Sequence, residues 1–144
     1  MATRPTPRRR KTGGDLTTQP TRHPPHGERL SPVAENYLLA LYILGEEGVR
    51  ATLGHLADYL RRMPAGEGLG TSLPTVNGMV RRMEREGLLQ FAPDKAVHLT
   101  ERGQILAEDM VRRHRLAERL AVDLLGVELA DAHVEAHRLE HAIS

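Results

Sequence analysis

The sequence predicts a mainly α-helical protein, and three observations support this prediction. Apolar residues make up 40% of the chain but aromatic residues only 3%, so the core must be built from Leu, Val, Ala and Met, which favours helices over a β-sandwich. Apolar residues also recur every three or four positions along several stretches, as they do on one face of a helix. Finally, residues that cap helices precede these stretches, and glycines follow them.

Three helices are expected in the first part of the chain. The first begins at its cap Ser31, with Pro32 in the first turn, and ends at Gly45. The third begins at its cap Ser72 and ends at Gly87. The apolar faces of the three helices are, in order, Val33, Tyr37, Leu41 and Leu44; Leu53, Leu56, Ala57 and Leu60; and Val76, Met79, Val80 and Met83.

The connection between the second and third helices is longer than the turn of about 3–4 residues that is usual in a helix–turn–helix. It contains a polar, Gly-rich stretch at residues 64–70. Two alternatives follow: either the second helix continues through Arg61 and Arg62, or a flexible loop lies here.

A hairpin and two further helices are expected next. Residues 88–92 and 96–99 are short apolar runs on either side of a Pro-Asp-Lys turn, which is typical of a β-hairpin. Thr100 then caps a long helix that Gly126 ends, with Leu106, Met110, Ala117, Leu120 and Leu124 on one side. A last helix is expected to begin near Glu128 or Leu129 and to continue to Ser144, with Ala132, Ala136, Leu139 and Ile143 as its apolar face. Three helices followed by a hairpin is the order of a winged helix–turn–helix.

The charge of the chain is uneven. The first 29 residues hold seven of the 20 basic residues but two of the 19 acidic ones, which leaves 13 basic and 17 acidic residues in the remainder. Because the first 28 residues also hold five of the nine prolines and show no hydrophobic period, we expect a disordered basic arm there. Such an arm can follow a phosphate backbone or merely aid solubility.

Several classes of protein are excluded by composition. The chain has no cysteine, which excludes disulfides and thiolate metal ligands. Its apolar stretches are far shorter than the ~20 residues of a membrane span, and its basic start is followed by Pro and Gly rather than by the apolar segment of a signal peptide. We therefore expect a cytoplasmic protein with no membrane partner.

The third helix is expected to present a DNA-binding face. In a winged helix–turn–helix this helix enters the major groove, and the hairpin lies beside the phosphates. Short polar side chains near its start can reach base edges, whereas arginines further along suit phosphates. The candidates are Ser72, Pro74, Thr75, Asn77, Arg81, Arg82 and Arg85, with Lys95 at the tip of the hairpin. The alternative is an ordinary solvated face of a small helix.

Histidines and glutamates near the end of the chain predict a metal site. Four of the eight histidines lie between residues 114 and 141. His114 and Glu118 are four apart and share one face of the long helix. His133, His137, Glu140 and His141 form a second stripe beside an apolar one. Without thiolates, Mn(II), Fe(II), Co(II), Ni(II) and Zn(II) all remain chemically open, and a plain polar helix face is the alternative.

Residues 137–141 also match His-x-x-Glu-His, a pattern found in inverted zinc peptidases, where the glutamate activates water. This pattern is short, and catalysis would need a third ligand and a substrate cleft. We therefore expect no enzymatic activity.

Longer motifs resemble the diphtheria-toxin-repressor family of iron- and manganese-dependent regulators. They are Glu35-Asn36-Tyr37-Leu38, residues 46–49, 74–76, 82–88 and 99–103, and above all Arg113-His114-Arg115-Leu116-Ala117-Glu118-Arg119-Leu120 and residues 135–144. The resemblance covers residues 31–144 apart from residues 61–71, which resemble an insertion. It implies a winged helix–turn–helix over residues 29–100, followed by the start of a helical metal-binding and dimerisation domain over residues 101–144.

The resemblance also implies two metal sites. The ancillary site would use His114, Glu118 and His133. The primary site would use Asn36, His137, Glu140 and His141, where His137 replaces a cysteine or glutamate of the family and Asn36 a methionine or aspartate. Leu39 stands where one manganese-responsive branch has a further glutamate, so that branch's binuclear arrangement is not expected.

The function implied is a Mn(II)- or Fe(II)-dependent repressor of metal-homeostasis genes. It would bind double-stranded DNA at a palindromic operator as a homodimer. The family continues beyond the last helix seen here, so the chain is expected to be truncated at its C-terminus and its dimerisation weakened. The alternatives are a winged-helix regulator without metal control and, less favoured, the zinc peptidase.

Overall fold

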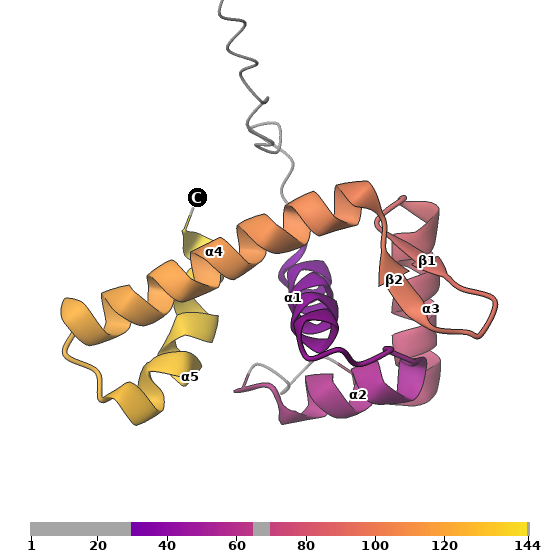
Figure 1. Ribbon diagram of the computed structural model, residues 1–144. Coiled ribbons are helices and arrows are strands. Elements are labelled where there is room, and N and C mark those ends of the chain that lie inside the picture. The colour runs from indigo at the N-terminus through magenta and orange to yellow at the C-terminus, as the bar shows by residue number, and fades with distance from the viewer. Residues whose placement is uncertain (1–29, 65–69, 144) are drawn as a thin grey trace, which may run out of the picture.

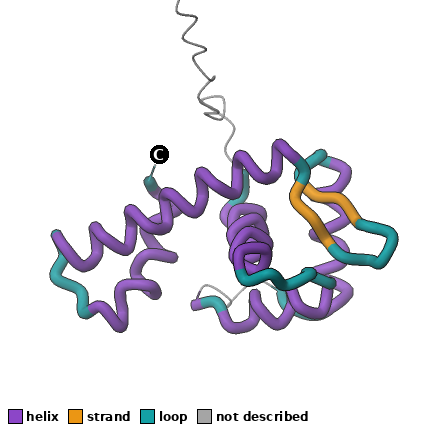
Figure 2. The backbone as a smooth tube through the Cα atoms, viewed as in Figure 1, coloured by secondary structure: helices purple, strands orange, loops and turns teal. Residues whose placement is uncertain are grey.

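The computed structural model describes residues 30–64 and 70–143. Their elements are α1 (Pro32–Glu46), α2 (Leu53–Arg62), α3 (Leu73–Arg85), β1 (Leu89–Phe91), β2 (Val97–Leu99), α4 (Glu101–Asp123), α5 (Leu129–Leu139) and the short 3-10 helix η2 (Glu140–Ala142) (Figure 1). The basic arm predicted for residues 1–28 and the centre of the 61–71 loop lie outside the described residues. The expected fold class, mainly helical with one small wing, is confirmed (Figure 2).

The predicted helix caps are present. The hydroxyl of Ser31 accepts a hydrogen bond from the amide of Ala34 at 3.2 Å, and Ser72 and Thr100 cap α3 and α4 in the same way. Each cap satisfies one of the amide groups that a helix leaves unpaired at its start. The second helix does continue through Arg61 and Arg62, as one of the two alternatives predicts, because α2 ends at Arg62. The loop alternative stays a prediction, because residues 65–69 lie outside the described residues.

The prediction that the last helix continues to Ser144 is wrong. The α-helix ends at Leu139, and residues 140–142 form the tighter 3-10 turn. Such turns often finish α-helices. Here the turn accompanies an inward position of the Glu140 side chain, which is fully buried against α4 and α5.

Two of the predicted apolar stripes need correction. On α1, Val33 lies at the surface, while residues 34–41 are all buried, Glu35 and Asn36 among them. This burial on every side follows from the packing of α1 against both α2 and α4. On α4 the expected stripe is buried at Leu106, Met110 and Ala117 but not at its end, where Leu124 is 76% exposed.

The wing is joined closely to the start of α4. Strands β1 and β2 pair antiparallel, with Gln90 opposite His98, and the hydroxyl of Thr100 donates to the carbonyl of Gly87 at 2.6 Å. A Cβ atom at Gly103 would lie 2.0 Å from the carbonyl oxygen of Leu88, so only glycine fits there. From this junction α4 runs past α1 to α5 (Figure 1), and it therefore links the winged part to the helices at the C-terminus. No helix in the described ranges is both long and apolar enough to cross a membrane.

Candidate metal centre and nucleic-acid surface

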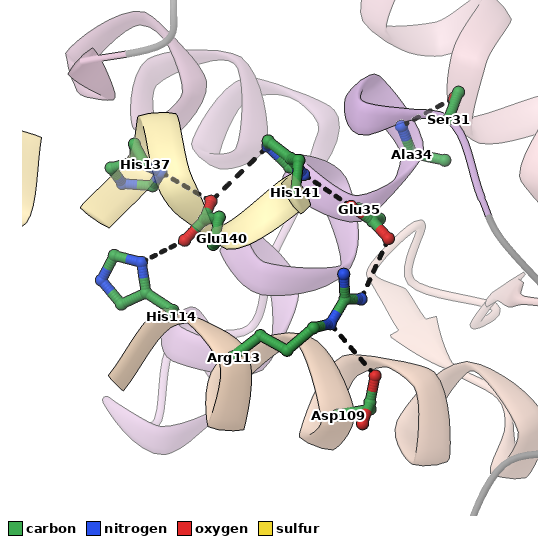
Figure 3. Close-up of polar contacts among 9 residues, drawn as sticks. All are labelled: Ser31, Ala34, Glu35, Asp109, Arg113, His114, His137, Glu140 and His141. Atoms are coloured by element: carbon green, nitrogen blue, oxygen red, sulfur yellow. Dashed lines mark hydrogen bonds and ion pairs between the residues drawn. The ribbon is translucent and has the colours of Figure 1, made fainter. Parts of the chain in front are cut away.

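The candidate metal ligands come from α1, α4, α5 and η2. Figure 3 shows four of them, His114, His137, Glu140 and His141. The contributing side chains are Glu35 and Asn36 from α1; Arg113, His114 and Glu118 from α4; His133 and His137 from α5; and Glu140 and His141 from η2. All seven residues predicted as primary or ancillary ligands come from these elements.

Glu140 lies at the centre of this group. Its side chain is fully buried, and Nδ1 of His114 and Nδ1 of His137 each donate to one of its carboxylate oxygens, the latter at 2.9 Å. Burial alone would raise the pKa of Glu140, but the hydrogen bonds and charges of the two histidines outweigh burial and lower the pKa to about 2. The group is therefore an ionised carboxylate inside the protein.

His114, Glu118 and His133 are brought together as predicted. Nε2 of His114 lies 3.1 Å from Nδ1 of His133 and 3.2 Å from Oε1 of Glu118, and Nδ1 of His133 lies 3.0 Å from the same oxygen. Burial lowers the pKa of His114, but the hydrogen bonds and charges of Glu140 and Glu118 raise it further, and the pKa of His114 is raised overall. These two nitrogens and one oxygen form a compact donor set.

His141 and Asn36 each carry a buried atom without a partner. Nδ1 of His141 donates to Oε2 of Glu35 at 2.5 Å, and in a neutral ring with this hydrogen bond the lone pair is on Nε2. This Nε2 atom and the side-chain oxygen Oδ1 of Asn36 are buried, and neither finds a hydrogen-bond partner among the described residues. Nε2 of His141 lies 3.6 Å from Oε1 of Glu140. A buried acceptor left unpaired costs about 1–3 kcal/mol, and an imidazole nitrogen or an amide oxygen is an atom that a divalent cation can bind.

The chemistry of this donor set fits such a cation. Imidazole nitrogens, a carboxylate and an amide oxygen are borderline and hard ligands, which suit divalent ions such as Mn(II) and Fe(II). The side chains of Glu140 and Asn36 are buried, so the donors are already withdrawn from water.

Sequence reasoning missed Glu35 and Arg113. One guanidinium nitrogen of Arg113 donates to Oε1 of Glu35 at 2.9 Å, and another donates to Asp109 at 3.1 Å. Burial raises the pKa of Glu35, but its hydrogen bonds with His141 and Arg113 and their charges lower it overall. The one signal available was a charged residue within the apolar stretch of the first helix, and its partner is 78 positions away.

His137 lies nearer to the ancillary residues than predicted. Its ring centroid is 4.8 Å from that of His114 and 4.7 Å from that of His133. One ring nitrogen from each of these three histidines lies within 4.8 Å of the other two. His137 thus contacts Glu140, as the primary site requires, and also adjoins the two histidines of the ancillary site.

The candidate DNA-binding residues lie on the outer side of α3 and at the wing tip. Ser72, Pro74, Thr75, Asn77, Arg81, Arg82, Arg85 and Lys95 are all exposed. Ser72 also caps α3, whereas Arg81 pairs with Glu84 on the same helix at 2.9 Å and Arg82 pairs with the C-cap residue Glu86 at 3.0 Å. The guanidinium of Arg81 additionally lies 4.1 Å from the ring centroid of Phe91 in the wing, so it ties α3 to β1.

Both halves of the chain match a known protein family. Residues 29–97 match the family described as "Iron dependent repressor, N-terminal DNA binding domain". Residues 100–144 match "Iron dependent repressor, metal binding and dimerisation domain".

Two curated relatives illustrate the similarity. The iron-dependent repressor IdeR of Mycobacterium tuberculosis is 44% identical over 115 residues, which cover 80% of this chain and 46% of that protein. The diphtheria toxin repressor of Corynebacterium diphtheriae is 40% identical over 115 residues, with 80% and 47% covered. The chain therefore spans about half the length of the curated relatives it matches.

Solved structures agree with this similarity. A manganese-dependent transcriptional repressor in complex with manganese superposes with a TM-score of 0.64 at 34% identity, over 77% of this chain and 47% of that one. The metal-dependent transcriptional regulator MtsR superposes with a TM-score of 0.65 at 29% identity, over 80% and 49%.

Proposed function

Because this chain belongs to the iron-dependent repressor family, we propose that it acts in the cytoplasm as a Mn(II)- or Fe(II)-dependent repressor of metal-homeostasis genes. Its winged part, residues 29–100, would bind a palindromic operator, and its helical part, residues 101–144, would bind metal and support a homodimer. Both named relatives are repressors, and the two solved neighbours are a manganese-dependent repressor and a metal-dependent regulator.

The single observation that supports metal control best is that two buried atoms, Oδ1 of Asn36 and Nε2 of His141, find no partner within residues 30–64 and 70–143. They come from α1 and η2, and they would hold an ion together with Glu140 and His137. A bound ion would supply a positive charge that accepts these lone pairs. His114, Glu118 and His133 would form the ancillary site.

The positions of these residues in the fold support metal control. Asn36 belongs to α1, which packs against α2, the helix before the DNA-reading helix α3. Donors on α1 and η2 therefore connect the winged part to the C-terminal helices. A ligand shifts a conformational equilibrium only as far as it binds one arrangement more tightly. Here the favoured arrangement would be the one in which two copies of α3 match the spacing of an operator.

Exposed leucines support the expected homodimer. Leu116 is 52% exposed, and Leu124, Leu125 and Leu129, near the turn between α4 and α5, are 61–80% exposed. Large apolar side chains gathered at one end of a molecule commonly mark an interface with another chain. A second copy of the chain would bring a second winged part to the DNA.

The peptidase alternative has less support. The general base of such a site must reach a water molecule, yet the carboxylate of Glu140 is fully buried and both of its oxygens are engaged by histidines. This arrangement favours Glu140 as a ligand or as an orienting group. A winged-helix regulator without metal control remains the main rival, and it predicts no stoichiometric metal binding.

The test is the ratio of DNA affinity with Mn(II) to that with chelator, first against captured genomic fragments and then against the enriched sequence. The purified chain should enrich one palindrome only with metal. His141→Ala should abolish the metal effect, whereas His98→Ala, on the exposed side of β2, should leave the ratio unchanged. Equal enrichment with and without metal would support the rival regulator, and a His141→Ala variant that still responds to metal would refute the site.

A further inference from the structure

Gly78 stands in the interior of α3, where glycine is an unfavourable residue. Glycine loses more backbone freedom in a helix than alanine does, and it therefore lowers helix stability at such a position. Gly103 is required by its contact with the carbonyl of Leu88, but a Cβ atom at Gly78 would meet nothing within 4 Å. The backbone of Gly78 is also not in the left-handed conformation that favours glycine. Neither packing nor backbone conformation within the described residues accounts for this glycine.

Gly78 lies on the side of α3 that faces away from the core. The buried residues of this helix are Val76, Val80 and Met83. At 3.6 residues per turn, position 78 points almost directly opposite to the middle of this buried face. Gly78 is exposed, and so is its neighbour Asn77. The glycine therefore lies on the outermost line of the helix that is expected to enter the DNA groove.

The long side chains around Gly78 leave its backbone uncovered. Arg81 and Arg82 follow Gly78 by three and four positions, so they are its neighbours on the outer face. The guanidinium of Arg81 pairs with Glu84 at 2.9 Å. That of Arg82 pairs with Glu86 at 3.0 Å. Because both partners come later in the chain, they hold the two arginines away from Gly78, which agrees with the free space at its Cβ position.

A bare backbone at this place allows the helix to lie deeper in a groove. The major groove of B-form DNA is about 12 Å wide and about 8.5 Å deep, and an α-helix with its side chains is about 10–12 Å across. The fit is therefore tight, and the absence of a side chain on the outermost line shortens the distance between the helix and the base edges. A short side chain such as that of Asn77 can bind a base edge only from a helix that lies this close.

We infer that Gly78 is a positioning residue for DNA recognition. Its bare backbone is the point of close approach between α3 and the floor of the major groove, and this approach brings the amide of Asn77 within reach of a base. Any side chain at position 78 would hold the helix further out. The inference rests on the sequence-specific DNA binding of the proposed function, but it does not depend on metal control.

The experiment compares the stability and the DNA binding of Gly78→Ala in the 144-residue chain, because the two should change in opposite directions. The midpoint of urea denaturation should rise, since alanine favours the helix. Fluorescence anisotropy should show an affinity for the operator enriched from genomic fragments that is lower by about tenfold, by analogy with overpacking of a tight contact. The affinity for a scrambled duplex should hardly change, and Gly78→Leu should lower operator affinity further.

Gly45→Ala is the matched control. Gly45 is an exposed residue of α1, and a Cβ atom there would also meet nothing within 4 Å. This variant should raise the denaturation midpoint without changing either affinity. The double variant of Asn77→Ala and Gly78→Ala tests the route through Asn77. It should weaken operator binding by less than the product of the two separate effects, because both substitutions disrupt the same contact.

The outcomes separate this inference from the proposed function. If Gly78→Ala bound the operator as tightly as the unaltered chain, or if its effect and that of Asn77→Ala simply multiplied, the inference would be overturned and the proposed function would stand. A chain that selects one sequence with or without metal, and binds it more weakly in Gly78→Ala, would support the inference and refute metal control. An unaltered chain that selects no sequence at all would refute both.

Discussion

The carboxylate of Glu35 lies 2.5 Å from the imidazole of His141, between Oε2 and Nδ1, although 106 positions separate the two residues. The other oxygen of Glu35 accepts from Arg113 on α4 at 2.9 Å. A single buried carboxylate thus joins α1, α4 and η2. It also decides which nitrogen of His141 carries the proton, and it leaves Nε2 as the atom able to bind a cation.

Glu35→Gln should therefore weaken Mn(II) binding without removing any ligand. The amide fills the same space but has no charge, and it holds the Nδ1 proton of His141 less strongly. Loss of such an orienting carboxylate typically costs 10–100-fold in metal affinity, which calorimetric titration with Mn(II) would measure. Glu46→Gln, at the exposed end of α1, is the control. Equal affinities of Glu35→Gln and the unaltered chain would contradict the role of Glu35.

Gly103→Ala should destabilise the junction of wing and α4. The added methyl would lie 2.0 Å from the carbonyl oxygen of Leu88, so the backbone would have to move. Overpacking of this kind usually costs about 1–3 kcal/mol, measurable by urea denaturation. Gly78→Ala on α3 meets nothing within 4 Å and should raise stability by up to about 1 kcal/mol. If Gly103→Ala left the free energy of unfolding unchanged, the start of α4 would have to shift freely.

The fold could be predicted closely because its signals are local. Ser31, Ser72 and Thr100 cap helices within three residues of themselves, and the Pro-Asp-Lys turn lies directly between the strands it joins. The error at the end of the last helix concerns a local backbone conformation that depends on distant partners. Glu140 turns inward because His114, 26 positions away, holds its carboxylate.

The candidate site could be predicted only in part for the same reason. The i, i+4 spacing of His114 and Glu118 indicates a shared helix face, and the structure brings them within 3.2 Å. Spacing says nothing, however, about which residues of α1 meet the C-terminal turn. Glu35 was missed because its role depends on how α1 packs between other helices. The place of His137 depends on ring positions across two helices, which no periodicity encodes.

Acid should destabilise the metal-free chain through Glu140. Its pKa is about 2 when folded against a usual 4.5, because His114 and His137 hold the ionised form. A lowered folded-state pKa means that this stabilisation is fully present above pH 4.5 and is lost as the pH falls towards 2. Glu140→Gln should unfold more easily near neutral pH, by about 2 kcal/mol. Thermal melts in chelator should show the difference in stability between the unaltered chain and Glu140→Gln shrinking below pH about 4.5. A difference that stays constant with pH would contradict the lowered pKa.

Replacement of Asn77 should change sequence preference, whereas replacement of Lys95 should not. Asn77 is exposed on the outer side of α3, where an amide can form two hydrogen bonds to adenine in the major groove. Asn77→Ala should thus cost about 1–3 kcal/mol of binding free energy on the operator and almost nothing on unrelated DNA.

Lys95 is exposed at the wing tip and suits a phosphate. Lys95→Gln should weaken binding to all sequences alike and reduce the dependence of log affinity on log salt by about 1. Fluorescence anisotropy with operator and scrambled duplexes, each at several salt concentrations, separates the two effects. If Asn77→Ala weakened both duplexes equally, Asn77 would be a backbone contact, and base reading would have to come from other residues of α3.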